Sequence, residues 1–386
     1  MARIRADYPS SQPEWSTDSG SQIEPTTAEK ATGWKVGDKV PARKLNWLLD
    51  APNKWLKVAM ASVFGNYTKS DYGSAVGYGG LCWSPSESVW VRLQSGGASG
   101  NAYYSRDGIT WVLGAFQSTV IASNNSEHDY NGSVIYGGAS GVVSGAADPT
   151  TGAFLDTSTG LTGNVKTLRT KDDDDYIIVA DDNSQIAYAT AYFQTYTVVS
   201  VTESFTDLIH IPGASSQTWL GLSNTGKIYR TTNDGATWAL AGPGSPGAAA
   251  TLVDSWETMD IDPISGIICC MGVYTANDRW FAVYSTDFGD TWAQTGSIPS
   301  ANKEQDLSSP VRVRNLGGDV WIAGGGSTTK SGMLFSVDRL QTWQRMEVRA
   351  EIGTGGLNLV FALAGNDKRW MFGGNDTVWF GDNIPL

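Results

Sequence analysis

One eight-residue pattern recurs along this 386-residue chain and constrains the fold more than any other feature. Ser or Thr comes first, Asp or Asn stands two positions later, and Thr-Trp ends the pattern. The copies lie at 105–111, which is one residue shorter, and at 231–238, 285–292 and 336–343. The last three copies are spaced by about fifty residues, which suits one four-stranded blade with longer loops. The chain is therefore expected to repeat one small β-unit.

The residue types of the pattern suit a hairpin turn. Asp or Asn accepts hydrogen bonds from nearby backbone amides, Gly supplies a positive φ angle, and Thr-Trp begins the next strand. We predict structural, non-catalytic roles for these residues: Ser105, Asp107, Trp111, Asn233, Gly235, Trp238, Ser285, Asp287, Gly289, Trp292, Ser336, Asp338 and Trp343. A weaker copy at 189–196 keeps the spacing and ends in Thr195-Tyr196.

This pattern resembles the Asp box, or BNR repeat, of sialidase-like propellers. The resemblance implies an all-β fold, a β-propeller of about seven four-stranded blades, with six as the alternative. A blade without a clear copy is expected over 120–163. The C-terminus offers three strand-like runs, at 357–363, 369–372 and 377–380. We therefore expect the run at 63–68 to supply the missing strand and close the ring.

The first 61 residues differ in texture from the rest. Residues 1–33 are polar and rich in Pro, Ser and Thr, which predicts an extended arm. Residues 41–61 show the only helical periodicity. Pro52 interrupts it, so two short helices are expected to meet near Asp50, an N-cap candidate. The predicted organisation is an N-terminal arm and helical segment over 1–61 and a propeller over 62–386.

Composition disfavours several functional classes. The net charge of −12 opposes binding to nucleic acid. No apolar run is long enough to span a membrane, and the N-terminus does not resemble a signal peptide. Cys82, Cys269 and Cys270 offer neither a disulfide framework nor zinc-ligand spacing, so they are interpreted as small buried hydrophobes. No cofactor or metal is expected.

The sequence gives little support to a catalytic site. Sialidases, which the repeat resembles, have an Arg-Ile-Pro motif, and the nearest string here is His210-Ile211-Pro212. Arg312 and Arg314 alternate along one strand and could project from one face. They are interpreted as a carboxylate clamp or, preferably, as residues of a solvated blade edge. Residues 172–175 are four aspartates that suit a calcium site or, preferably, a solvated turn. His128 and His210 are too isolated for a triad or zinc site.

A second resemblance concerns residues 33–56. Gly33-Trp34-Lys35-Val36-Gly37, then Asn46-Trp47-Leu48-Leu49 and a second Trp eight residues on, resemble an N-terminal segment of tailed-bacteriophage virion proteins, including tail-fibre-like appendages. The resemblance implies attachment of the chain to other virion proteins through residues 1–61. The candidate attachment residues are Trp34, Leu45, Trp47, Leu48 and Trp55.

The expected function is that of a non-enzymatic virion protein, structural and adhesive, that is assembled in the host cytoplasm as a homo-oligomer within the particle. Its propeller would project and bind host-surface glycan. The connections 242–252, 298–307 and 349–356 should share one face but contain no aromatic residue, so a glycan would contact Tyr192 and Tyr274 instead. The alternatives are a sialidase-like glycan-cleaving enzyme, a tail nozzle or head-decoration protein without ligand, and a cellular protein-binding propeller.

Overall fold

The computed structural model describes most of the chain between Thr68 and Asp382, and the structural statements below concern only that part. It covers residues 68–71, 78–84, 87–94, 100–118, 126–128, 134–146, 150, 155–171, 174–190, 195–212, 217–241, 255–274, 279–295, 298, 311–316, 319–326, 331–346, 362–365, 369–373 and 377–382. Within these ranges the chain forms 28 strands and one short 3-10 helix, Ala139–Gly141. The predicted all-β class is confirmed.

The 28 described strands form seven antiparallel sheets of four strands each, which we call blades 1 to 7. Blades 1 to 6 take consecutive strands, from β2–β5 to β22–β25. Blade 7 combines β26–β28 with β1, from the other end of the described chain. The prediction of about seven four-stranded blades therefore holds. The blade expected over 120–163 is blade 2, which spans Ser126 to Ser158.

The strand bounds show how closely the blades repeat. Blades 1 and 2 comprise β2 (Tyr78–Ser84), β3 (Val89–Gln94), β4 (Gly100–Ser105), β5 (Val112–Ser118), β6 (Ser126–His128), β7 (Val134–Gly137), β8 (Val142–Ala146) and β9 (Leu155–Ser158). Blades 3 and 4 comprise β10 (Val165–Lys171), β11 (Asp174–Asp181), β12 (Gln185–Ala189), β13 (Thr197–Ser200), β14 (Phe205–His210), β15 (Trp219–Ser223), β16 (Ile228–Thr231) and β17 (Ala239–Leu240). Blades 5 and 6 comprise β18 (Ser255–Ile261), β19 (Ile268–Tyr274), β20 (Arg279–Ser285), β21 (Ala293–Gln294), β22 (Val311–Asn315), β23 (Trp321–Gly326), β24 (Ser331–Ser336) and β25 (Gln344–Met346). Blade 7 comprises β26 (Ala362–Gly365), β27 (Arg369–Gly373), β28 (Thr377–Asp382) and β1 (Thr68–Asp71).

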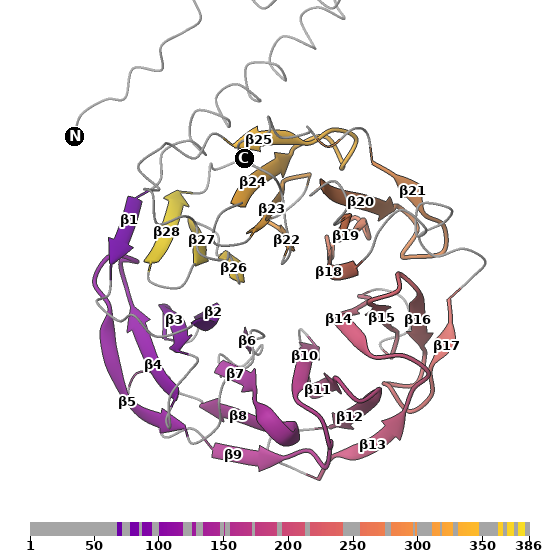
Figure 1. Ribbon diagram of the computed structural model, residues 1–386, viewed down its shortest axis with the longest axis horizontal. Coiled ribbons are helices and arrows are strands. Elements are labelled where there is room, and N and C mark those ends of the chain that lie inside the picture. Colours follow the sequence, from indigo (N-terminus) through magenta and orange to yellow (C-terminus); the bar gives the residue numbers. More distant parts are fainter. Residues whose placement is uncertain are drawn as a thin grey trace, which may run out of the picture. The chain divides into compact units, whose positions relative to one another are not determined.

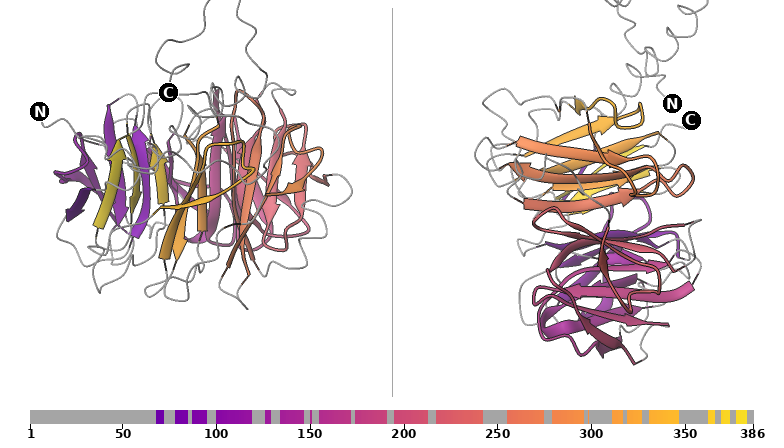
Figure 2. Two further views of the ribbon diagram at one scale, coloured as in Figure 1. Left: turned by 90° about the horizontal axis from the view of Figure 1, so that it is seen from above. Right: turned by 90° about the vertical axis from the view of Figure 1, so that its right-hand side faces the viewer.

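The blades are arranged in a closed ring (Figure 1). The first strand of each blade lies innermost, and each innermost strand contacts the next around the ring, including β26 with β2. The strands run across the thickness of the ring (Figure 2). Every hairpin connection therefore emerges at one of two faces. The turns after the first and third strands of a blade share one face, which we call the turn face.

Ring closure uses the N-terminal strand, as predicted, but at a shifted position. β1 pairs with β28 in the register Thr68↔Phe380 to Asp71↔Thr377. The expected strand at 63–68 overlaps this element only at Thr68, and residues 63–67 lie outside the described part. The apolar start of that run suggested the earlier position. The outermost strand of a blade pairs through its backbone and needs no apolar run.

The core lies between blades and is rich in tryptophan. Trp90, Trp219 and Trp321 occupy the second strands of blades 1, 4 and 6 and are almost fully buried. Each is the direct cross-strand partner of the Ser or Thr that opens the repeated turn of its own blade. Burial of one large apolar side chain stabilises the fold by about 1.5–3 kcal/mol. In these three blades the turn and the core are thus joined through one cross-strand pair.

Several predictions fall outside the described residues. The arm at 1–33, the two helices at 41–61 and the boundary at residue 61 remain predictions. The described propeller belongs to one compact unit, Tyr67–Pro385. A search of the described residues found no helix that is long and apolar enough to cross a membrane.

Candidate functional site

The repeated sequence pattern forms one specific hairpin turn between the third and fourth strands of its blade. In blade 5, the Ser285 hydroxyl donates to Asp287 Oδ1 at 2.8 Å and accepts from the Gly289 amide at 2.8 Å. Asp287 also accepts from the backbone amide of Thr291 at 2.8 Å and from its hydroxyl at 2.5 Å. Trp292 Nε1 donates to the Gly289 carbonyl. Every polar group of the pattern is used locally.

The other copies repeat this arrangement. Ser105 and Ser336 donate to Asp107 and Asp338, each at 3.0 Å, and each carboxylate binds the following Thr. In blade 4, Thr231 and Asn233 play the same parts at 2.8 Å. Tyr196, which ends the weaker copy, is buried between β12 and β13, and burial raises the pKa of its hydroxyl. Residues 191–194 of that copy lie outside the described part.

Two consecutive residues of the eight-residue turns adopt left-handed backbone angles. The pairs are Asp234 and Gly235 (φ 52° and 87°), Phe288 and Gly289 (57° and 87°), and Arg339 and Leu340 (57° and 65°). Leu340 therefore stands where the pattern predicts Gly, although its φ is unfavourable for an L-residue. Its side chain is fully buried in the core that blades 5 and 6 share. Burial of a leucine contributes about 1.5–3 kcal/mol, which offsets a conformational penalty of about 1–2 kcal/mol.

The turns of blades 5 and 6 also contact the preceding blade. Arg230 on β16 donates to Asp290 at 2.6 Å and to the Phe288 carbonyl at 3.0 Å. Gln341 Nε2 in the next turn donates to the Tyr284 hydroxyl of blade 5 at 2.9 Å. Together these contacts tie the turns into the ring. The hydrogen bonds support the predicted structural role, which the substitutions described in the Discussion test.

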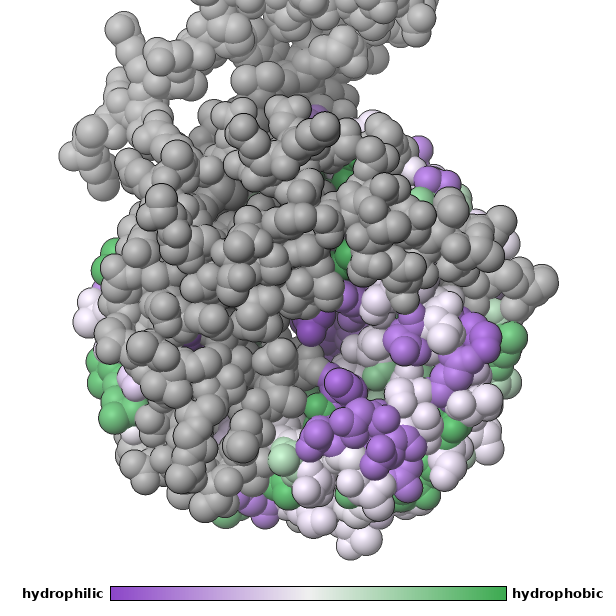
Figure 3. Space-filling view, viewed as in Figure 1, coloured by the Kyte–Doolittle hydropathy of each residue, from purple (hydrophilic) through white to green (hydrophobic). Residues whose placement is uncertain are grey.

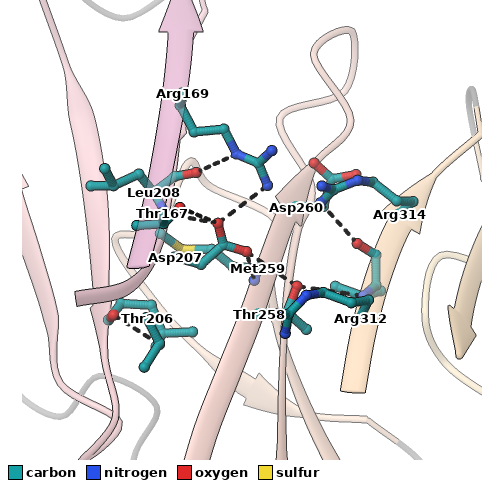
Figure 4. A network of polar contacts seen from close by, with 12 residues as sticks. Thr167, Arg169, Thr206, Asp207, Leu208, Thr258, Met259, Asp260, Arg312 and Arg314 are labelled. Carbon is teal, nitrogen blue, oxygen red and sulfur yellow. Dashed lines mark hydrogen bonds and ion pairs between the residues drawn. The ribbon is translucent and has the colours of Figure 1, made fainter. Parts of the chain in front are cut away.

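A second polar cluster lies on the innermost strands of blades 3 to 6 (Figure 4). We call it the inner-strand network. Its members come from β10, β14, β18 and β22: Thr167, Arg169, Asp207, Glu257, Thr258, Asp260, Arg312 and Arg314. Hydrophilic residues border the centre of the ring on the face seen in Figure 3. Because this cluster combines charge and burial at the ring centre, it is the strongest candidate for a functional site among the described residues.

Asp207 is the hub of the inner-strand network. Its carboxylate accepts hydrogen bonds from Arg169 Nη2 at 3.2 Å and from the Thr167 hydroxyl at 3.3 Å, both on blade 3. On blade 5 it accepts from the Thr258 hydroxyl at 3.1 Å and the Met259 amide at 3.0 Å. Arg169 Nε additionally donates to the Leu208 carbonyl at 2.9 Å. One buried carboxylate thus joins three blades.

A recurring irregularity places these polar side chains. The register between first and second strands shifts at Val165/Thr167, Phe205/Asp207 and Trp256/Thr258, near the start of β10, β14 and β18. β2 carries the same shift. A bulge redirects the side chains that follow it. Thr167, Asp207 and Thr258 follow the bulges in their strands and are all buried, and both threonine hydroxyls donate to the Asp207 carboxylate.

The edge of β22 is bound by side chains of the neighbouring blade. The amides of Val311, Val313 and Asn315 donate to Glu257 at 2.5 Å, Thr258 at 3.4 Å and Asp260 at 2.7 Å, respectively. An innermost strand has no further strand beside it, so these amides lack a backbone partner. The side chains of β18 supply one for every second residue.

The charges of the inner-strand network balance. Arg169, Arg312 and Arg314 face Asp207, Glu257 and Asp260. Burial by itself raises the pKa of Asp207, but Arg169, Arg314 and the Met259 amide hold it below its ordinary range. Burial raises the pKa of Asp260 and lowers that of Arg312. Three guanidinium groups thus face three carboxyl groups in this network.

Arg312 and Arg314 alternate along one strand at the edge of a blade, as the preferred interpretation expected, but this edge is the innermost one and is only partly solvated. They lie on an innermost strand and are half-buried beside the acidic residues of blade 5. Their guanidinium groups donate to the carbonyls of Val311 and Val313. The sequence alone does not reveal which edge of a blade a strand occupies.

The remaining candidate residues do not assemble into a site. His128 lies on β6 and His210 ends β14, two blades away, where its ring packs against Trp219 at 4.9 Å. Asp174 and Asp175 begin β11, whereas Asp172 and Asp173 lie outside the described part. The described residues contain no group of three or more potential metal ligands. The three cysteines are buried, as predicted.

The predicted binding residues remain predictions. Tyr192 and the attachment residues Trp34, Leu45, Trp47, Leu48 and Trp55 lie outside the described part. Tyr274 ends β19, opposite Arg279, but its side chain is not described. The connections 242–252, 298–307 and 349–356 are also outside it, except for Ile298. The described strands flanking them end on the face opposite the turn face.

Comparison with solved structures agrees with this architecture. The chain is similar to the WD40 β-propeller domain of Doa1, with a TM-score of 0.59 at 12% identity over 82% of this chain and 96% of that chain. It has the β-propeller fold. The RRP9 WD40 repeats match with a TM-score of 0.58 at 9% identity, over 82% and 98% of the two chains. YCF48 bound to D1 peptide matches with 0.57 at 11% identity, over 82% and 97%.

These identities establish the fold alone. No protein-family model matches the chain, and no curated protein sequence matches it. Function must therefore be argued from the residues of this propeller.

Proposed function

We propose that this propeller is a non-enzymatic binding scaffold and that residues 1–61 attach it to a larger assembly. The observation that carries the proposal is the use of the charged residues at the ring centre. Asp207, the most buried carboxylate among them, accepts hydrogen bonds from blades 3 and 5. These bonds occupy both of its oxygens, so the carboxylate serves the ring and not a substrate. A ring held this rigidly suits the display of surface turns to a partner.

The assembly that we propose is a bacteriophage particle. This part rests on the likeness of residues 33–56 to virion attachment segments and on the likeness of the repeated turns to Asp boxes. One of the similar solved structures, YCF48, was determined bound to a peptide. A propeller of this kind is thus able to serve as a protein-binding platform, and we propose that role here, with host-surface glycan as a further ligand.

Deletion of residues 1–61 tests the attachment. The truncated chain keeps β1 (Thr68–Asp71), so the ring can still close. We expect a folded propeller with the thermal midpoint of the full chain that no longer appears in purified particles. Incorporation at the level of the full-length chain would show that the attachment lies elsewhere.

The glycan ligand and the enzymatic alternative need separate assays. Replacing Tyr192 and Tyr274 by Ala should reduce adsorption to host cells or to a glycan array, because aromatic rings provide stacking surfaces for sugars. A folded double variant with unchanged binding would eliminate these two residues as a glycan platform. Release of sugar from host envelope by the purified chain, and its loss in Asp260→Asn, would instead favour the sialidase-like alternative.

A further inference from the structure

Two apolar side chains protrude from neighbouring turns of blade 5. Ile264, between β18 and β19, is 89% exposed, and Phe288, between β20 and β21, is 36% exposed. Both turns belong to the turn face. Single exposed apolar residues are common on protein surfaces. The backbone that holds these two makes them unusual.

The backbone of Phe288 adopts a conformation that is unfavourable for an aromatic residue. Its φ angle is 57°, in the left-handed region that aromatic residues rarely adopt. The equivalent positions of blades 4 and 6 carry the polar residues Asp234 and Arg339. The Phe288 carbonyl accepts a hydrogen bond from Arg230 at 3.0 Å, which fixes this backbone. Backbone strain of this kind persists where the surrounding structure imposes it, often at binding sites.

The turn that carries Ile264 is also fixed. Asp262 is almost fully buried, and its carboxylate accepts from the Ile264 amide at 3.1 Å and from the Ser265 hydroxyl. Gly266 has a φ of 72°, and a Cβ atom there would come within 2.4 Å of the Phe288 ring. The ring therefore lies directly against the Ile264 turn. Because Phe288 packs against the turn that carries Ile264, we call these two apolar side chains the anchor pair.

The anchor pair stands on an acidic face. Among the described residues of the turn face, acidic side chains outnumber basic ones. The acidic residues are Glu87, Asp107, Asp234, Asp262, Asp287, Asp290, Asp319 and Asp338, and the basic residues are Arg106, Lys171, Arg230 and Arg339. Asp287 and Asp290 belong to the same turn as Phe288. Two copies of this acidic face would repel each other.

We propose that Ile264 and Phe288 anchor a protein partner that offers an apolar pocket bordered by Lys and Arg. Rigid aromatic and aliphatic side chains lose little freedom on binding and commonly carry most of the affinity of an interface. The surrounding carboxylates would attract a basic rim and make association depend on salt. The proposal rests on the proposed role as a binding scaffold and names the surface and the chemistry of one partner.

Photocrosslinking in the native assembly provides the first test. A benzophenone amino acid replaces Ile264 in the full-length chain, and the control carries it in place of Leu240, which is 55% exposed on the outermost strand of blade 4. We expect one dominant protein adduct at position 264, in a basic region of its partner, that decreases at high salt. No adduct, equal adducts at both positions, or an adduct with glycan, lipid or a second copy of this chain would overturn the proposal.

The second test measures the affinity of the chain for the purified partner that the crosslinking identifies. Phe288→Asn removes the ring and places a residue that accepts the left-handed conformation. It should bind at least about tenfold more weakly while its thermal midpoint equals or exceeds that of the wild type. Ile264→Ser should behave similarly, and Leu240→Ser should bind normally. Unchanged binding by Phe288→Asn would contradict the proposal.

Incorporation into particles separates this proposal from the proposed attachment role. Phe288→Asn should incorporate normally, because residues 1–61 are intact. If the chain lacking residues 1–61 is incorporated as well, the attachment proposal fails. The affinity of Phe288→Asn for the partner still tests whether Ile264 and Phe288 form a binding surface.

Discussion

The repeated turns and the inner-strand network are both polar, but they differ in how far apart their partners lie in the sequence. Asp287 binds Ser285, Asp290 and Thr291, all within four residues, and the other turns repeat this arrangement. Asp207 binds residues about 40 and 50 positions away and has no charged equivalent in the neighbouring described blades. Local repetition builds each blade. Unrepeated long-range contacts join the blades into a ring.

The largest effect is expected where the inner-strand network loses its hub. Asp207→Ala removes the carboxylate that accepts from Arg169 Nη2, and it leaves the Thr258 hydroxyl and the Met259 amide without their acceptor. Breaking a buried ion pair from one side costs about 3–5 kcal/mol. Urea unfolding should measure this loss.

A surface aspartate provides the control for Asp207→Ala. Asp182 is exposed and accepts a hydrogen bond from the Asn164 amide at 2.8 Å. Asp182→Ala should lower the free energy of unfolding by about 1 kcal/mol or less. Equal losses in the two variants would contradict the special position of Asp207.

The next largest effect is expected at Leu340. Leu340→Ala empties a fully buried position between blades 5 and 6, and such substitutions cost about 2–5 kcal/mol. Leu340→Gly relieves the left-handed backbone but loses the same burial, so it should also be destabilising. A Leu340→Gly variant more stable than the wild type would show that strain outweighs burial at this turn.

A smaller loss is expected for a single turn. Asp287→Ala removes the acceptor for two backbone amides and should cost about 1–2 kcal/mol, as the loss of a capping carboxylate does. Binding activity of the folded fraction should persist. Loss of binding with an unchanged thermal midpoint would mean that the turn carboxylate contacts a ligand.

The smallest effect concerns acid stability. The Thr110 amide, together with Ile109 and Ser105, lowers the pKa of Asp107 to about 2, although partial burial opposes this shift. Because the folded-state pKa is below that of the unfolded chain, ionised Asp107 stabilises the fold above pH 3.8, and this contribution is lost as the pH falls toward 2. Asp107→Asn should unfold with a shallower pH dependence in this range. An identical pH profile would contradict the assignment.

The sequence was sufficient for the blades because the turn chemistry is local. Ser, Asp, Gly and Trp at fixed offsets predict a hairpin wherever they occur, and their spacing predicts a blade. The same logic located ring closure, although the pairing strand, Thr68–Asp71, is polar and was expected a few residues earlier. An outermost strand buries little, so its position leaves a weak signal.

The inner-strand network could not be predicted in the same way. Asp207 occurs in an ordinary strand pattern. Its role in joining the blades depends on three bulges that no local sequence motif predicts. Arg312 and Arg314 were noticed, but the choice between the inner and the outer edge of a blade requires the strand order. Departures from the repeat are a usable signal in the sequence. Phe288 and Leu340 both occupy turn positions where a left-handed backbone favours Asn, Asp or Gly.

A double-mutant cycle between Arg169 and Asp207 tests the central claim, that the charged residues of the ring centre hold blades together. Arg169→Met, Asp207→Asn and the double variant are compared with the wild type by urea unfolding, with Asp207→Asn and Asp287→Asn as a reference cycle of distant residues. We predict a coupling free energy above about 1 kcal/mol for the first cycle and below about 0.5 kcal/mol for the second. Additive losses in the first cycle would contradict the account and reopen the ring centre as a ligand site.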